Sequence, residues 1–413
     1  MEPSCAAPKA VPSTNDAAAG ATVLQSAAGV RARCAIVSEA ARRGETRHFQ
    51  LVCARLDKAA RRVVEITRRR YPDLCVPLHS RWRHFSAGGV DRAALIAPRA
   101  DAAETARARI DLAVVSVLLD AGTGPDWCYH DKATDQVLSR SEGLAVASLR
   151  AMQAGTFSAD PSNPWRADAE ALLEITPQKL AGALQHTADN ELVGLEGRAV
   201  MMRRLGEACA ASPTLFGVPA RLGGLYDHWS ARGEALPTAE MLGTLLQAFA
   251  AIWPDRISLA GVPLGDCGRH PAIPGDGIVP FHKLCQWLAY SLVEPLQGAG
   301  LQVSELDGLT GIAEYRNGGL FLDCGVIQPR DPSLLHRPLD ALSEPVVEWR
   351  ALTVNLLDHL AVRVRERLGM DASRFPLAKV LEGGSWAAGR EIVFERRKDG
   401  SPPLTVLSDG TLF

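Results

Sequence analysis

The stretch DAAETARARIDLAVVSVLLD, residues 101–120, indicates the fold class of this chain. Asp101 and Glu104 have the spacing of a helix-capping box, so a helix is expected to begin there. Its second half, from Leu112 onward, is apolar on every side, as in a helix buried in the middle of a protein. Gly122 is well placed to end the helix. The stretch therefore predicts a central, buried α-helix.

Other segments repeat the helical pattern, with apolar residues three and four positions apart. We expect further helices over 57–71, 238–253 (with Thr238 as its N-cap), 280–296 and 348–369. Extended structure is expected only in short pieces, over 319–327 and as two runs around Asp399-Gly400 within 390–413. The predicted fold is a mainly α single domain over 21–413, with small β-hairpins, one of them at the C-terminus. Residues 1–20, rich in Ala, Pro, Ser and Asn, are expected to form a disordered tail.

Composition excludes several classes of protein. The 45 basic and 47 acidic residues leave a net charge of -2, which argues against a nucleic-acid-binding protein. Nine cysteines without a CxxC pair favour buried thiols in a reducing cytosol. The sequence lacks a secretory signal and an apolar stretch long enough to cross a bilayer. We therefore expect a cytoplasmic protein with no nucleic-acid or membrane partner, for which a homo-oligomer is compatible with the sequence.

The first concentration of polar side chains is HSRWRHFSAGGVDR, residues 79–92. Arg81, Arg83 and Arg92 could bind a phosphate or carboxylate, because guanidinium groups match such anions with two parallel hydrogen bonds. The alternative is a loop held in place by ordinary arginine hydrogen bonds.

The second is LLDAGTGPDWCYHD, residues 118–131, which follows the buried helix. Its aspartates could accept hydrogen bonds from sugar hydroxyls, and Trp127 or Tyr129 could stack on a ring. A zinc site built from Cys128, His130 and Asp131 lacks recognisable ligand spacing. The other reading is a capped helix followed by a polar turn.

Three later stretches carry further candidates. In FHKLCQWLAYS (281–291), Lys283 in the first turn of a helix opposes the helix dipole unless it shares an anion with the free amides, although a solvent-exposed lysine is the alternative. In LTGIAEYRNGGLFLDCG (309–325), Glu314 and Asp323 could serve as the carboxylates of glycosidic hydrolysis or form structural salt bridges. EGGSWAAGR (382–390) places Glu382 among small residues, as a pocket wall or as packing.

These motifs together resemble one family, the uncharacterised-domain proteins encoded with the URC pathway of uracil catabolism in fungi and bacteria. Besides the stretches above, RSEGLAVASL (140–149) and LEGGSWAAGREI (381–392) carry the likeness, which spans nearly the whole chain after the tail. In that pathway a ribosyl-urea 5-phosphate would have to release urea. The resemblance implies that this family cleaves the ribosyl-urea 5-phosphate to release urea.

A remoter resemblance is to the queuosine-salvage N-ribosyl hydrolases, whose helical fold is akin to that of DNA glycosylases. His282-Lys283 with Gln286 is similar to their Tyr-Lys helix, and Leu309-Thr310 with Glu314-Tyr315-Arg316 is similar to their Leu-Thr and Asp-Tyr-Arg segment. The likeness implies that Lys283 holds a 5-phosphate and that Glu314 is the catalytic carboxylate. Glu in place of Asp moves the carboxylate by roughly 1 Å, so the pocket must differ.

The expected activity is hydrolysis of the N-glycosidic bond of a ribosyl-urea 5-phosphate to urea and ribose 5-phosphate, with no cofactor and no metal. The expected catalytic residues are Glu314 and Asp120. The expected substrate-binding residues are His79, Arg81, Arg83, Asp126, Trp127, Asp131, His282, Lys283, Tyr315, Arg316, Asp323 and Glu382. Two alternatives are a metal- or cysteine-dependent hydrolase of the ureido group and a non-enzymatic, nucleotide-binding partner of the ring-opening enzyme.

Overall fold

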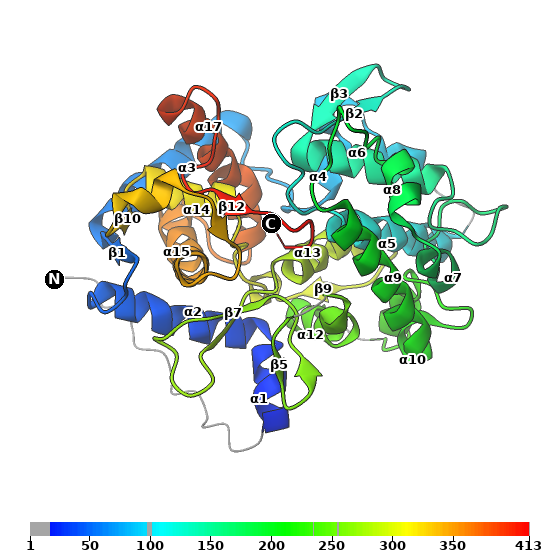
Figure 1. Ribbon diagram of the computed structural model, residues 1–413, viewed down its shortest axis with the longest axis horizontal. Helices are drawn as coiled ribbons and strands as arrows, with labels where there is room; N and C mark the ends of the chain where they lie inside the picture. The colour runs from blue at the N-terminus through cyan, green and yellow to red at the C-terminus, as the bar shows by residue number, and fades with distance from the viewer. Residues whose placement is uncertain (1–16, 97–100, 234, 254–255, 413) are drawn as a thin grey trace. The chain divides into compact units, whose positions relative to one another are not determined.

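The chain is built mainly from helices, as the sequence predicts. The computed structural model describes residues 17–96, 101–233, 235–253 and 256–412 (Figure 1). Every sheet in these residues has only two strands. The chain forms two compact units, each made of three separate stretches: unit 1 is Met1–Leu74, Ile257–Phe281 and Thr310–Thr405, and unit 2 is Cys75–Arg256, His282–Leu309 and Val406–Phe413. A single domain over 21–413 therefore stays a prediction.

Unit 1 is organised around the long helix α15, Glu344–Leu368, which packs against α2 and α3. Pro345 in the first turn favours the helix start, and Gly369 ends the helix in the left-handed conformation at φ 67°. The predicted helix 348–369 therefore exists but begins earlier. The other helices of this unit are α1 (Ala17–Leu24), α2 (Ala27–Arg42), α3 (Leu56–Arg70), α14 (Tyr315–Asp323), α16 (Leu377–Val380) and α17 (Trp386–Arg396).

The strands of unit 1 form short antiparallel pairs. They are β1 (Phe49–Leu51) with β10 (Ile327–Pro329), β5 (Ser258–Leu259) with β6 (Val262–Pro263), and β7 (Cys267–Arg269) with β8 (Ile278–Pro280). One apolar core joins α2, β8 and α15; it includes Val30, Cys34, Val37, Val279, Val347, Ala351 and Val354. Strand β11 (Leu339–Asp340) also lies in unit 1.

Unit 2 is organised around α5, Ala102–Leu118 (Figure 1), and this helix packs against α6, α11 and α13. The Asp101 carboxylate caps this helix by accepting the N–H of Ala103 at 2.9 Å, and every residue from Ile110 to Leu119 is buried. The predicted central helix is thus confirmed. Glu104, however, bonds Arg221 and Arg107.

The remaining elements of unit 2 are mostly short. Its other helices are α4 (Trp82–Phe85), α6 (Arg140–Gln153), α7 (Ala169–Leu173), α8 (Pro177–Ala183), α9 (Leu195–Ala211), α10 (Pro213–Phe216), α11 (Gly224–Ser230), α12 (Thr238–Phe249) and α13 (Lys283–Gly298). Strand β2 (Cys128–Asp131) pairs antiparallel with β3 (Gln136–Ser139), and β4 (Leu236–Pro237) pairs parallel with β9 (Val303–Ser304). Strand β12 is Val406–Leu407.

Several local predictions were wrong. Residues 390–396 lie in α17 and 319–323 in α14, so neither segment is extended there, although β10 and β12 supply short strands nearby. The helix expected over 280–296 begins at Lys283, because 278–280 form β8. Thr238 does not cap its helix, since its hydroxyl donates to the Glu305 carbonyl at 2.5 Å. Residues 17–20 are helical, and residues 1–16 of the expected tail lie outside the described residues.

Candidate functional site

The turn after α5 is held by one buried arginine of α9. Arg198 donates to the carbonyls of Leu119 (3.2 Å), Ala121 (2.9 Å) and Gly122 (2.9 Å), and also to that of Val193. Burial lowers the pKa of Arg198 to about 10, with the charge of Asp120 opposing the effect, so the guanidinium stays charged at neutral pH. Arg198 therefore fixes the backbone on both sides of Asp120.

Asp120 forms an ion pair with Arg81, which is completely buried. One carboxylate oxygen, Oδ1, lies 3.0 Å from Arg81 Nη1, and the other accepts the Ser141 hydroxyl at 2.6 Å. Burial lowers the pKa of Arg81, and the neighbouring carboxylate of Asp120 counteracts that shift. The Asp120 side chain keeps 11% of its surface exposed, although Oδ1 is buried, so a fully buried cation is joined to a side chain that is not fully buried.

Trp287 of α13 lies against the same arginine. The Arg81 guanidinium carbon is 5.2 Å from the centre of the indole ring. His79 stacks on the indole with ring centres 6.2 Å apart, and His84 approaches it edge-on at 5.4 Å. His84 Nδ1 is also 3.2 Å from Arg81 Nη1 and 3.1 Å from the Ser141 hydroxyl. We call His79, Arg81, His84, Asp120, Ser141 and Trp287 the Arg81 cluster.

The same helix α13 begins beside two other candidates. Its N-cap is His282, which is buried and adopts the left-handed conformation at φ 52°, a backbone state that non-glycine residues rarely adopt. Lys283, half-buried, is the first residue of the helix, as the sequence predicts. Lys283 and Trp287 are four residues apart and so lie on one face of α13.

The other candidates of unit 2 do not belong to the cluster. Arg83 pairs with Glu294 and is part-exposed, and Asp126 is exposed. Trp127 is fully buried and donates to the Leu184 carbonyl at 3.0 Å, which is the setting of a structural anchor. Gly143 of α6 lies so close that an added Cβ would be 2.9 Å from the Trp127 ring.

Asp131 is buried between two arginines. It accepts from Arg92 Nε at 2.7 Å, from Arg150 Nε at 2.9 Å and from the Thr134 hydroxyl at 2.9 Å. Burial alone would raise the pKa of Asp131, but these hydrogen bonds outweigh it and lower the pKa to about 2. The carboxylate thus joins β2 to α6, and Arg92 likewise has a structural role here.

In unit 1, Glu314 caps α14. Its carboxylate accepts the backbone N–H groups of Arg316 at 2.8 Å and of Asn317 at 2.5 Å. Arg316 is buried, its guanidinium carbon 4.1 Å from the centre of the Trp386 ring, and its Nε donates to the Tyr315 hydroxyl at 3.1 Å. Glu314, Tyr315 and Arg316 therefore form one ordered group, in which the Glu314 carboxylate is fixed by the helix start.

The remaining candidates of unit 1 lie in ion pairs. Asp323 receives two hydrogen bonds from Arg397, at 2.9 and 2.5 Å. Glu382 is buried in the π-helical turn Leu381–Ser385, with its Oε1 3.6 Å from Arg70 Nη2. These contacts connect α17 and its neighbouring turn to the rest of unit 1.

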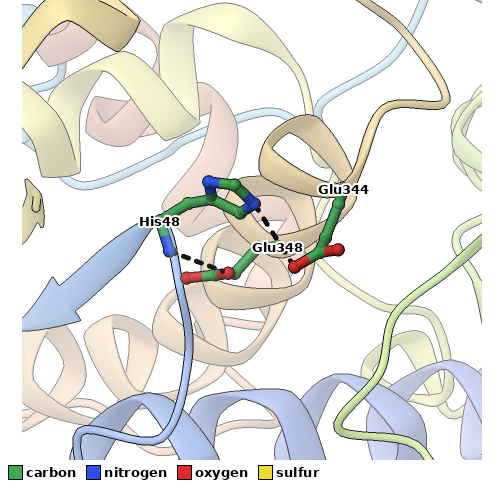
Figure 2. A group of neighbouring side chains, drawn as sticks. All are labelled: His48, Glu344 and Glu348. Carbon is green, nitrogen blue, oxygen red and sulfur yellow. Dashed lines mark hydrogen bonds and ion pairs between the residues drawn. The ribbon is translucent and has the colours of Figure 1, made fainter. Parts of the chain in front are cut away.

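Among the residues that the structure describes, one group has metal-ligand chemistry. His48, Glu344 and Glu348 offer ligand atoms within 4.8 Å of one another (Figure 2). Glu348 already accepts the backbone N–H of Phe49 at 2.8 Å, and its other oxygen lies 3.3 Å from His270 Nε2. The group thus has a structural role in anchoring β1 to α15. At the zinc site considered from the sequence, Asp131 bonds to arginines and His130 Nε2 lies 2.8 Å from Asp135.

The structure thus brings together three candidates of unit 2, His79, Arg81 and Asp120, and adds residues that sequence reasoning missed. Ser141 was missed because no local pattern marks a residue that hydrogen-bonds a distant arginine. His84 lies only three residues after Arg81, but its contact with Ser141 depends on the packing of separate segments. Trp287 could have been suspected, because it lies one helical turn after Lys283 on the same face.

Comparisons with known proteins identify relatives over most of the chain. The chain is 40% identical over 346 residues to Protein urg3 of Schizosaccharomyces pombe, covering 82% of this chain and 84% of that protein. It is 35% identical over 413 residues to Uracil catabolism protein 4 of Lachancea kluyveri, covering 90% of this chain and 93% of that protein. Within the described ranges, no helix combines the length and the apolar character needed to span a bilayer. Residues 23–413 match the family described as Protein of unknown function (DUF1688), and the chain belongs to that family.

Proposed function

We propose that this protein acts in uracil catabolism as a hydrolase that cleaves a ribosyl-urea 5-phosphate to urea and ribose 5-phosphate. The metabolic role is supported by the name of one relative, Uracil catabolism protein 4, which is 35% identical across 90% of this chain. The reaction is supported by the chemistry of unit 2.

The observation that carries the proposal is the carboxylate of Asp120, held by a buried guanidinium yet partly exposed. A carboxylate fixed in this way can stabilise the positive charge that develops at an anomeric carbon. Ser141 donates to this carboxylate, and Arg198 fixes the backbone on both sides of Asp120, so little reorganisation is needed during the reaction.

Helix α13 supplies a place for the phosphate. Lys283 lies in its first turn, where backbone N–H groups and the helix dipole also favour an anion. Trp287 follows one turn later, about 6 Å along the helix axis. A ribose with its 5-phosphate at Lys283 would extend along this face and direct its anomeric substituent toward the Arg81 cluster.

In the proposed reaction the bond between C1 of the ribose and the ureido nitrogen breaks. Its electron pair passes to the ureido group, and positive charge grows at C1 beside the Asp120 carboxylate. Water then adds to C1, and its proton ends on the ureido nitrogen, giving neutral urea. Every atom comes from the substrate and one water molecule, and no electron is transferred to a third group.

The family resemblance favours a different carboxylate, Glu314, so the two are compared directly. Purified protein is given ribosyl-urea 5-phosphate and the release of urea is measured. We expect the wild type to turn over the substrate and kcat to fall by about 100-fold or more in Asp120→Asn. A loss of this size is typical when one group that stabilises transition-state charge is removed. A large loss in Glu314→Gln, with Asp120→Asn active, would assign the catalytic role to Glu314. The matched control for Glu314→Gln is Asp331→Asn, because Asp331 is another carboxylate of unit 1 that caps a helix by accepting a backbone N–H.

A second function, hydrolysis of the ureido group itself, has one supporting observation. Such enzymes use a metal or a reactive cysteine, and His48, Glu344 and Glu348 could supply metal ligands. Ammonia and carbon dioxide in place of urea, with activity lost on treatment with EDTA and restored by a divalent metal, would establish this function. The N-glycosidic reaction predicts no such loss.

A further inference from the structure

We propose that Arg81 and Trp287 form a pair of hydrogen-bond donors that binds the carbonyl oxygen of a ureido group. The reaction role of this pair rests on the proposed function, whereas the binding of a ureide does not. Both side chains are at least nine-tenths buried, with Arg81 0% and Trp287 7% exposed. Each has one donor nitrogen without a hydrogen-bond partner among the described residues.

The guanidinium of Arg81 is fully engaged except at one end. Its Nε donates to the Ser116 hydroxyl at 2.7 Å, and its Nη1 to the carbonyl and hydroxyl of Ser141 at 3.0 and 3.1 Å. Ser116 is itself held by the Ser148 hydroxyl at 2.6 Å. Nη2 is a buried atom that makes no such bond to any residue the structure describes. Buried donors are nearly always paired, so this end of Arg81 is a candidate for a ligand contact.

The indole of Trp287, which lies against the Arg81 guanidinium, also has a donor without a hydrogen-bond partner among the described residues. Three side chains fix the ring: Arg81 at 5.2 Å, His79 at 6.2 Å and His84 at 5.4 Å between centres. Its Nε1–H makes no hydrogen bond in the described part of the chain. A rigid ring with an unsatisfied N–H is preorganised to donate to a ligand without loss of its own freedom.

Asp120 decides which ligand chemistry fits. Its Oδ1 makes an ion pair with Arg81 but no aligned hydrogen bond within the described part of the chain, so it can still accept one. Two N–H donors beside a carboxylate match a group that presents C=O and N–H together, as a ureide does. A phosphate or carboxylate would instead meet the negative charge of Asp120 and be repelled. The cluster therefore favours a neutral ureide over an anion.

The same contacts would assist departure of urea. When the bond from C1 to nitrogen breaks, negative charge spreads from nitrogen to the ureido oxygen. N–H donors placed at that oxygen stabilise this charge more than they stabilise the ground state, which is how an oxyanion hole lowers a barrier. Arg81 and Trp287 would thus stabilise the leaving group as urea departs.

The test uses Trp287→Phe, which keeps an aromatic ring and removes the N–H. The matched control is Trp229→Phe on α11, which removes another buried indole N–H that has no partner among the described residues. Both variants are checked for equal melting temperature. We expect Trp287→Phe to lower kcat for urea release from ribosyl-urea 5-phosphate by about 10- to 100-fold, with the inhibition constant of ribose 5-phosphate unchanged. Trp229→Phe should retain wild-type kinetics.

Equal kinetics of the two variants would overturn the inference while leaving the proposed function in place. If wild-type protein releases no urea, binding of ribosyl-urea 5-phosphate is measured by calorimetry instead. An affinity that falls about tenfold in Trp287→Phe and not in Trp229→Phe would support the donor pair even though the proposed reaction had failed. Equal affinities of the two variants, or no binding by the wild type, would reject the donor pair.

Discussion

Replacing Arg198 by lysine tests whether one side chain holds Asp120 in position. The guanidinium donates to four backbone carbonyls, those of Leu119, Ala121, Gly122 and Val193. These bonds come from three different nitrogens, whereas lysine has only one. An ammonium in the place of Nη2 could keep the bonds to Ala121 and Gly122, but the bonds to Leu119 and Val193 would be lost. Because a hydrogen bond from a charged donor contributes about 1.5–3 kcal/mol, the expected loss is about 3–6 kcal/mol in the free energy of unfolding of unit 2.

Thermal unfolding followed by circular dichroism measures this loss. For a folding unit of about 150–250 residues, the size class of unit 2, we expect the melting temperature of Arg198→Lys to fall by roughly 6 °C or more. Urea release should also fall at temperatures where the variant remains folded, because the turn carrying Asp120 is no longer fixed. The control is Arg203→Lys on the same helix, whose side chain donates to the Ile175 carbonyl at 2.8 Å, and a smaller change is expected there. A melting temperature of Arg198→Lys within about 1 °C of wild type would refute the reasoning.

Two further predictions concern charge. The pKa of Asp131 is about 2 in the folded protein and 3.8 ordinarily, so its ionised form contributes about 2 kcal/mol that is present above pH 4 and lost as the pH falls toward 2. The stability difference between wild type and Asp131→Asn, from urea unfolding, should therefore shrink over that range, and a constant difference would contradict the assignment. Lys283→Met should raise KM for ribosyl-urea 5-phosphate by about 10- to 100-fold, because the contact with the phosphate is lost. KM for the unphosphorylated ribosyl-urea should stay unchanged. An equal effect on both substrates would exclude a phosphate contact.

Helices were predictable where the apolar pattern was strong. The buried segment after Leu112 and the long helix ended by Gly369 follow directly from local sequence. The segment 390–396 was mispredicted because its β-branched residues favour a strand locally. It is helical because α17 packs tightly on α14: a Cβ added to Gly389 would lie 2.1 Å from the Arg316 carbonyl oxygen. Such a contact between distant segments has no local signal.

The candidate site was predictable only in part. Asp120 and Arg81 were identified because a carboxylate at the end of a buried helix and an arginine-rich loop are unusual chemically. That the two pair with each other, and that Ser141 and Trp287 complete the cluster, depends on how four segments of unit 2 pack together. Conversely, Trp127 and Asp131 looked equally reactive in sequence, but burial and full hydrogen bonding give them structural roles.

The most direct test of the proposed reaction follows the ureido carbon itself. Ribosyl-urea 5-phosphate labelled with carbon-13 in the ureido group is incubated with the purified protein, and the reaction is recorded by NMR. If the N-glycosidic bond is cleaved, the label appears in urea, in equal amount to the ribose 5-phosphate formed. Appearance of the label in bicarbonate, with release of ammonia, would show that the ureido bond is cleaved and would contradict the account.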